Sequence, residues 1–83
     1  MKLIDLSLHT VARIASMALD AAVAHRLRAV GVFEDESIVV LRRASFGGPL
    51  HVRTSSGGEF AIDRRIASEI EIEIVSDEAE AAE

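Results

Sequence analysis

Three histidines are the side chains best suited to metal binding, because the sequence contains no cysteine. His9, His25 and His51 are too far apart for the i, i+4 pairs or short chelating spacings that build a metal site within one chain. His51 and Glu59, however, fall on two segments that we expect to form one hairpin. Two imidazoles and a carboxylate from different molecules can complete a zinc site, so this pair is a candidate for surface-bound zinc and a metal-bridged dimer. A solvated histidine with no ligand role is the alternative.

Catalysis requires a convergent set of titratable or nucleophilic groups, and the sequence does not supply one. It has no Ser/His/Asp order and no HExxH pair. Gly47-Gly48 is followed by Pro49 and an apolar strand, whereas a phosphate-binding loop opens a helix whose amides face the anion. These glycines therefore indicate a turn. We expect a protein that is not an enzyme and that requires no cofactor.

Arginine supplies eight of the nine basic side chains, and guanidinium groups favour planar, bidentate contacts with carboxylates. Some of these arginines fall on segments that we expect to be neighbouring strands, and others on a predicted helix. An exposed Phe46 at a loop tip could anchor a partner beside them. A solvated basic face without function is the alternative. The candidate partner-binding residues are Arg26, Arg28, Arg42, Arg43, Phe46 and Arg53.

Length and composition limit the class of protein. The 83 residues suffice for one small domain, and the absence of cysteine excludes disulfides and thiolate chemistry. No segment reaches the roughly 20 apolar residues of a membrane span, so we expect a cytoplasmic protein without membrane insertion. With three Phe and no Trp or Tyr, it lacks the aromatic platform on which nucleic-acid bases stack.

The net charge of −5 is unevenly distributed. Seven of the 14 acids lie from Glu69 onward, where there is no base. The other seven face nine Lys and Arg in residues 1–68, which leaves that part at +2. We therefore expect a partner surface on the body of the domain, residues 1–75, and a disordered acidic tail over residues 76–83.

The elements that must position these residues are short. Asp20 as N-cap and Gly31 after the last turn predict a helix over Ala21–Val30, with Val23, Leu27 and Val30 on its buried face. Ile70–Ile74 alternates strictly and predicts a half-buried strand with isoleucine inside. Further strands are expected around Thr10–Met17, Ile38–Leu41, Leu50–Arg53 and Phe60–Ile62, with a helical turn over Asp63–Ser68. Together these elements predict a mainly β fold, a small closed or half-open barrel of about five strands.

Three segments of the chain carry a family pattern: Arg26–Val32, Ile38–Leu50 and Phe60–Ala67. They resemble the FeoA family, the small cytoplasmic ferrous iron transport protein A, over about Leu3–Ile74. The resemblance implies an SH3-like β-barrel with a short α-helix after the first strand. The family usually has a Pro-Gly turn at two places where this chain has Leu8-His9 and Glu34-Asp35; we expect turns at both.

The resemblance also implies a function. The family assists the ferrous iron permease FeoB, a membrane protein with a cytoplasmic GTP-binding domain. We therefore expect a non-enzymatic accessory of ferrous iron uptake that docks on this cytoplasmic region. Zinc or ferrous ion could bind at the surface through His51 and Glu59. The alternative is a metal-responsive regulatory module, because similar SH3-like domains are appended to iron-dependent repressors.

Overall fold

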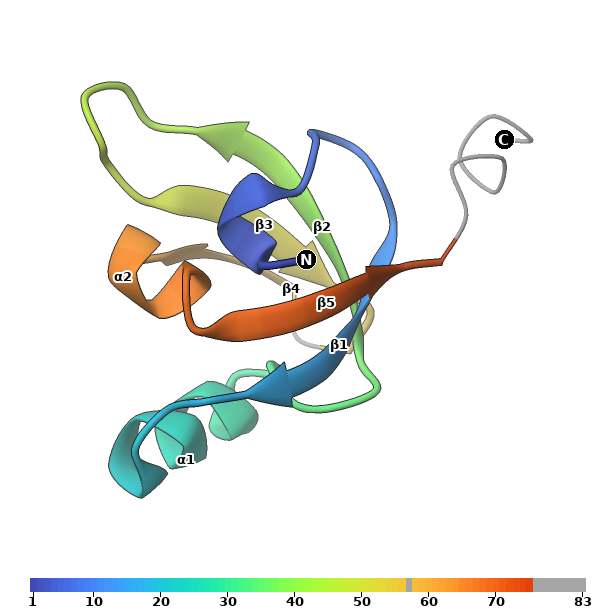
Figure 1. Ribbon diagram of the computed structural model, residues 1–83, viewed down its shortest axis with the longest axis vertical. Helices are drawn as coiled ribbons and strands as arrows, with labels where there is room; N and C mark the ends of the chain where they lie inside the picture. The colour runs from blue at the N-terminus through green and yellow to red at the C-terminus, as the bar shows by residue number, and fades with distance from the viewer. Residues whose placement is uncertain (57, 76–83) are drawn as a thin grey trace.

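The computed structural model describes residues 1–56 and 58–75, so the predicted acidic tail over residues 76–83 lies outside the described residues. One five-stranded antiparallel sheet with the order β4-β3-β2-β1-β5 forms the fold (Figure 1). Its strands are β1 (Ala12–Met17), β2 (Ser37–Arg43), β3 (Leu50–Thr54), β4 (Gly58–Ile62) and β5 (Ile70–Ile74). Because β4 and β5 are the two edges of the sheet, the barrel is half-open. The predicted SH3-like, mainly β fold is confirmed.

The inward-facing residues of all five strands form one aliphatic core. Ile14, Ile38, Val52, Ile62 and Ile72 are all at most 2% exposed. Register shifts at Ile14/Ser16 in β1 and at Val40/Arg42 in β2 interrupt the ladders. Such bulges bend a strand and increase its twist, which curls a small sheet around its own core.

The N-terminal segment covers this core in a way that the sequence did not predict. A 3-10 turn, η1 (Leu3–Asp5), lies beside β5 and α2, a helical turn over Arg64–Ala67. Leu3 and Leu6 are fully buried. The apolar residues before β1 therefore close part of the open barrel, and β1 itself begins at Ala12 instead of Thr10.

The helix α1 spans Ala21–Ala29, one residue shorter than predicted. Asp20 caps it by accepting a hydrogen bond from the amide of Val23 at 3.0 Å, and Gly31 follows with a φ of 100°. Val23 and Leu27 are half-buried, as expected for the inner face. The prediction for Val30 was wrong, because it is 46% exposed. The reason is that α1 lies at one end of the molecule, where it can pack on one side only (Figure 1).

Two of the predicted turns have left-handed backbones. His9 has a φ of 63° and Asp35 a φ of 74°, at the places where the family usually has Pro-Gly. Glycine adopts this conformation without strain, whereas a side chain with a Cβ does so at some cost. The turns are therefore present even though the glycines are not.

The last strand and the second helical turn lie where the sequence predicted them. The strand Ile70–Ile74 matches β5 residue for residue, although Ile74 is 47% exposed and so does not face the core as predicted. Asp63 caps α2 by accepting a hydrogen bond from the amide of Arg65 at 2.7 Å, as expected for a helical turn there.

Among the described residues, no helix has the length and hydrophobicity to cross a membrane.

Candidate functional site

The outer face of β2, β3 and β4 brings four of the predicted site residues together. Arg42 pairs with His51 across β2 and β3, and Arg53 pairs with Glu59 across β3 and β4. His51 and Arg53 are two residues apart and therefore share this face. We call Arg42, His51, Arg53 and Glu59 the outer-sheet patch. Within the described ranges, the two guanidinium groups have no hydrogen-bond or ion-pair partner, so they are available to an external carboxylate.

His51 and Glu59 form a contact within this patch, 3.2 Å from Nε2 to Oε1. The two side chains are 27% and 52% exposed, so the imidazole points outward as expected. One imidazole and one carboxylate are two of the four ligands that zinc requires. No group of three or more metal-ligating side chains occurs in the part of the chain that the structure describes. These two side chains would leave the other positions of a zinc ion to water or to a second molecule.

Arg43 is oriented differently from its neighbour Arg42. Its guanidinium donates hydrogen bonds to the backbone carbonyls of Ile4, at 2.8 Å, and of Leu6. Both carbonyls belong to the N-terminal segment around η1. Arg43 thus fixes that segment against the end of β2, and its guanidinium is already bound to two backbone carbonyls.

The two arginines of α1 lie far from the loop between β2 and β3 (Figure 1). Arg26 and Arg28 are exposed, and Arg28 pairs with Glu34 at 3.4 Å. In Figure 1, α1 occupies one end of the long axis, whereas the loop between β2 and β3 reaches the other end. The structure therefore does not bring Arg26 and Arg28 together with Phe46, which lies in that loop.

The loop 44–49 holds Phe46 away from the body of the domain. Phe46 is fully exposed, at 105% of its reference surface, and its φ is 59°. The loop is closed by a hydrogen bond from the amide of Ala44 to the carbonyl of Pro49, at 3.0 Å. A Cβ on Gly48 would lie 2.6 Å from the Cβ of Ala44, so the turn accepts only glycine there. The loop is thus a tight turn that presents one aromatic ring to solvent.

Glu36, in the loop before β2, connects that loop to the turn after β3. Its carboxylate accepts hydrogen bonds from the Ser55 hydroxyl at 2.6 Å and from the Ser56 amide at 2.7 Å. The Ser55 hydrogen bond first, and those from Ser56 second, hold the pKa of Glu36 below its ordinary value of 4.5. At the sheet edge, the N-terminal amine and then Lys2 lower the pKa of Glu71 in the same way.

The lowered pKa values of Glu36 and Glu71 predict that the free energy of unfolding decreases in acid. Because the pKa of each is lower in the folded protein than in the unfolded chain, their contribution is present above about pH 4.5 and is lost as the pH falls through the folded-state pKa. Urea unfolding at neutral pH and at pH values below 4.5 should show a falling free energy of unfolding. Glu36→Gln keeps an acceptor for both serines but cannot titrate, so its decrease should be smaller. An equal decrease in both proteins would contradict the assignment to Glu36.

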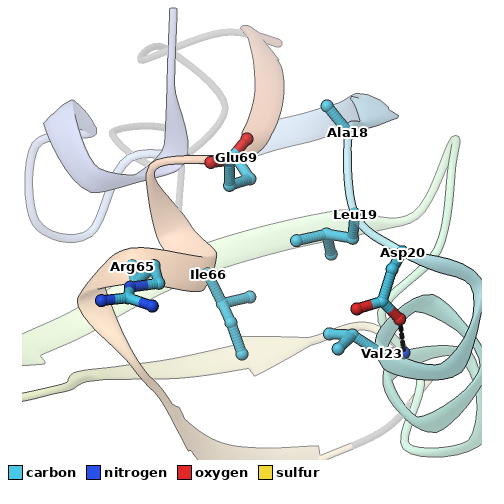
Figure 2. A pocket seen from close by; sticks show the side chains of 7 residues that line it. All are labelled: Ala18, Leu19, Asp20, Val23, Arg65, Ile66 and Glu69. Atoms are coloured by element: carbon cyan, nitrogen blue, oxygen red, sulfur yellow. Dashed lines mark hydrogen bonds between the residues drawn. The ribbon is translucent and has the colours of Figure 1, made fainter.

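A cavity that the sequence did not predict lies between the start of α1 and α2. Its volume is about 350 Å³ (Figure 2). Leu19, Val23 and Ile66 give it an apolar lining, and their side chains point toward one another across it. Its charged residues are Asp20, Arg65 and Glu69. Periodicity could not find this cavity, because its two sides are more than 40 residues apart in the sequence.

Together, the half-open five-stranded sheet and the single helix after β1 define a small SH3-like β domain, whose outer face over β2, β3 and β4 is polar. The family model of the FeoA domain matches residues 1–74. The chain belongs to the FeoA family, as the sequence pattern predicted. This is a family of small accessory proteins of ferrous iron transport, not a known family of enzymes. No curated protein matches the chain.

Solved structures agree with this assignment. The FeoA protein from Chlorobium tepidum is 32% identical, with a TM-score of 0.84 over 92% of this chain and 71% of its own. A FeoA from Stenotrophomonas maltophilia, in complex with zinc and described as a procaryotic SH3 domain protein, is 28% identical with a TM-score of 0.71, covering 88% and 89% of the two chains. A manganese-dependent transcriptional repressor is 20% identical with a TM-score of 0.79, over 90% of this chain and 36% of its own. At that identity, the repressor shows a shared fold only.

Proposed function

We propose that this protein is a non-enzymatic, cytoplasmic accessory of ferrous iron uptake that docks on the GTP-binding region of the permease FeoB. The docking surface is Phe46 together with Arg42 and Arg53 of the outer-sheet patch. The aromatic ring supplies the desolvated anchor, and the two guanidinium groups select an acidic partner surface.

The observation that carries this proposal is the conformation of Phe46. A fully exposed phenylalanine is unfavourable in water, and a left-handed φ adds backbone strain. Strain of this kind tends to persist at functional positions, where the surrounding structure holds it in place. Here the turn around Gly48 holds it, and nothing in the described part of the chain covers the ring.

The test is the affinity for the purified cytoplasmic domain of FeoB. Phe46→Ser should weaken binding by roughly 30-fold or more, the cost of truncating a central anchor. Arg42→Glu should slow association and reduce its salt dependence, because a basic residue that steers the encounter becomes repulsive. Surface plasmon resonance at two salt concentrations measures both effects.

Two variants serve as matched controls. Phe46→Leu keeps an apolar side chain at the tip and should retain most of the affinity. Arg26→Glu makes the same charge reversal on α1, at the opposite end of the molecule, and should change the affinity much less than Arg42→Glu does. Unchanged binding of both Phe46→Ser and Arg42→Glu would contradict the proposal.

Metal titration distinguishes the alternative, a metal-responsive regulatory module. If the protein is a permease accessory, the monomer should show no low-micromolar binding of zinc or ferrous ion by calorimetry, because His51 and Glu59 are two ligands only. Weaker zinc binding, where it occurs, should produce dimers and should be lost in His51→Ala. Tight binding by the monomer would favour the regulatory module.

A further inference from the structure

The exposed ring of Phe46 and the α1–α2 cavity are compatible in size and in charge. An apolar cavity of about 150 Å³ is large enough to hold benzene. The cavity beside α1 is about 350 Å³, so it has room for the ring of Phe46 and part of the turn that carries it. The ring would contact Leu19, Val23 and Ile66, which leave this cavity partly open to solvent.

Charge favours the same pairing. Two of the three charged residues of the cavity are acidic, Asp20 and Glu69. The segment 42–49 contains two arginines and no acid, and Arg42 among them has no partner in the described part of the chain. Arg42 lies four residues before Phe46, so seating the ring would bring its guanidinium near a lining that has two acids and one base.

One molecule cannot make this contact with itself. The loop 44–49 reaches one end of the long axis, whereas α1, which forms one wall of the cavity, lies at the other end (Figure 1). The ring is also fully exposed in the monomer. The occupant must therefore come from a second chain.

We propose that this protein self-associates head to tail, with Phe46 of one copy seated in the α1–α2 cavity of the next. The two surfaces are different, so each contact leaves a free loop at one end and a free cavity at the other. Assembly can then continue beyond a dimer. The contact is small and belongs to the weak class of interfaces, so it forms at high protein concentration. It also covers Phe46, so self-association and docking through that ring exclude each other.

Sedimentation velocity of the full chain tests this at concentrations up to about 1 mM, the range in which weak contacts are populated. The mean mass of the parent protein should rise with concentration and exceed that of a dimer. Phe46→Ser removes the ring, and Val23→Arg replaces part of the apolar lining of the cavity with a long charged side chain. Each variant alone should remain monomeric. Both positions lie outside the buried core, so the fold should be retained, and circular dichroism checks this.

Mixing the two variants provides the decisive measurement. Phe46→Ser still has a free cavity, and Val23→Arg still has a free loop, so an equimolar mixture should form a heterodimer and nothing larger. A parent protein that stays monomeric up to the highest concentration would overturn the proposal. So would a mixture that stays monomeric, or a single variant that associates like the parent. The experiment contains no permease, so its failure would leave the docking proposal to be decided by the affinity measurements.

Discussion

Arg43→Met is expected to lower the free energy of unfolding by about 2 to 4 kcal/mol, because it removes two hydrogen bonds from a charged donor to backbone carbonyls. Methionine keeps a long apolar stem, so the loss reports mainly on the guanidinium. Without it, the carbonyls of Ile4 and Leu6 lose their partner in a partly buried position. The N-terminal segment, which covers the core with Leu3 and Leu6, should then open.

Arg42→Met is the matched control for this variant. Arg42 is the preceding residue on the same strand, and it is exposed without a partner in the described ranges. Its replacement should change the free energy of unfolding by no more than about 0.5 kcal/mol. Urea unfolding measures both variants, and amide hydrogen exchange of residues 3–6 shows whether the loss is local to this segment. If the two variants are equally stable, Arg43 does not hold the segment in place.

Leu50→Ala is the second large effect, a loss of about 2 to 5 kcal/mol. Leu50 is fully buried at the start of β3, between Arg43 of β2 and Ile62 of β4 in the ladder. At roughly 0.05 to 0.15 kcal/mol per residue, a chain of this size has about 4 to 12 kcal/mol in total. The substitution therefore removes a large share of the stability, and a clearly lower urea midpoint should result.

For Leu27→Ala, the sequence pattern and the structure predict different losses of stability. The helical periodicity alone places Leu27 inside and predicts a similar cost. In the structure, however, Leu27 is only half-buried on a helix without a fully buried residue. Part of its side chain is already in water, so the loss should be about 1 to 2 kcal/mol. A loss as large as that of Leu50→Ala would mean that α1 packs more tightly than described.

The elements with a strong local signal could be read directly from the sequence. The alternation of Ile70–Ile74 is a local property of five residues, and so are the Asp20 cap and the Asp63 turn. Burial at the ends of elements could not be read in this way. Val30 and Ile74 fit their patterns but are about half exposed, because each lies at the end of its element, and the other residues that the structure describes do not cover it.

In the candidate site, too, some features could be predicted from the sequence and others only from the tertiary structure. The sequence alone determined the residue types and the order of the hairpins, so His51 and Glu59 were expected in one hairpin, and Arg42 and Arg53 on neighbouring strands. Only the tertiary structure decided which arginine turns toward the N-terminal segment and which remains in solvent. It also decided that α1 and α2 border a cavity, and that Phe46 is fully exposed. The physical reason is that hairpin pairing and capping act between residues close in sequence, whereas these decisions depend on contacts between segments about 40 residues apart.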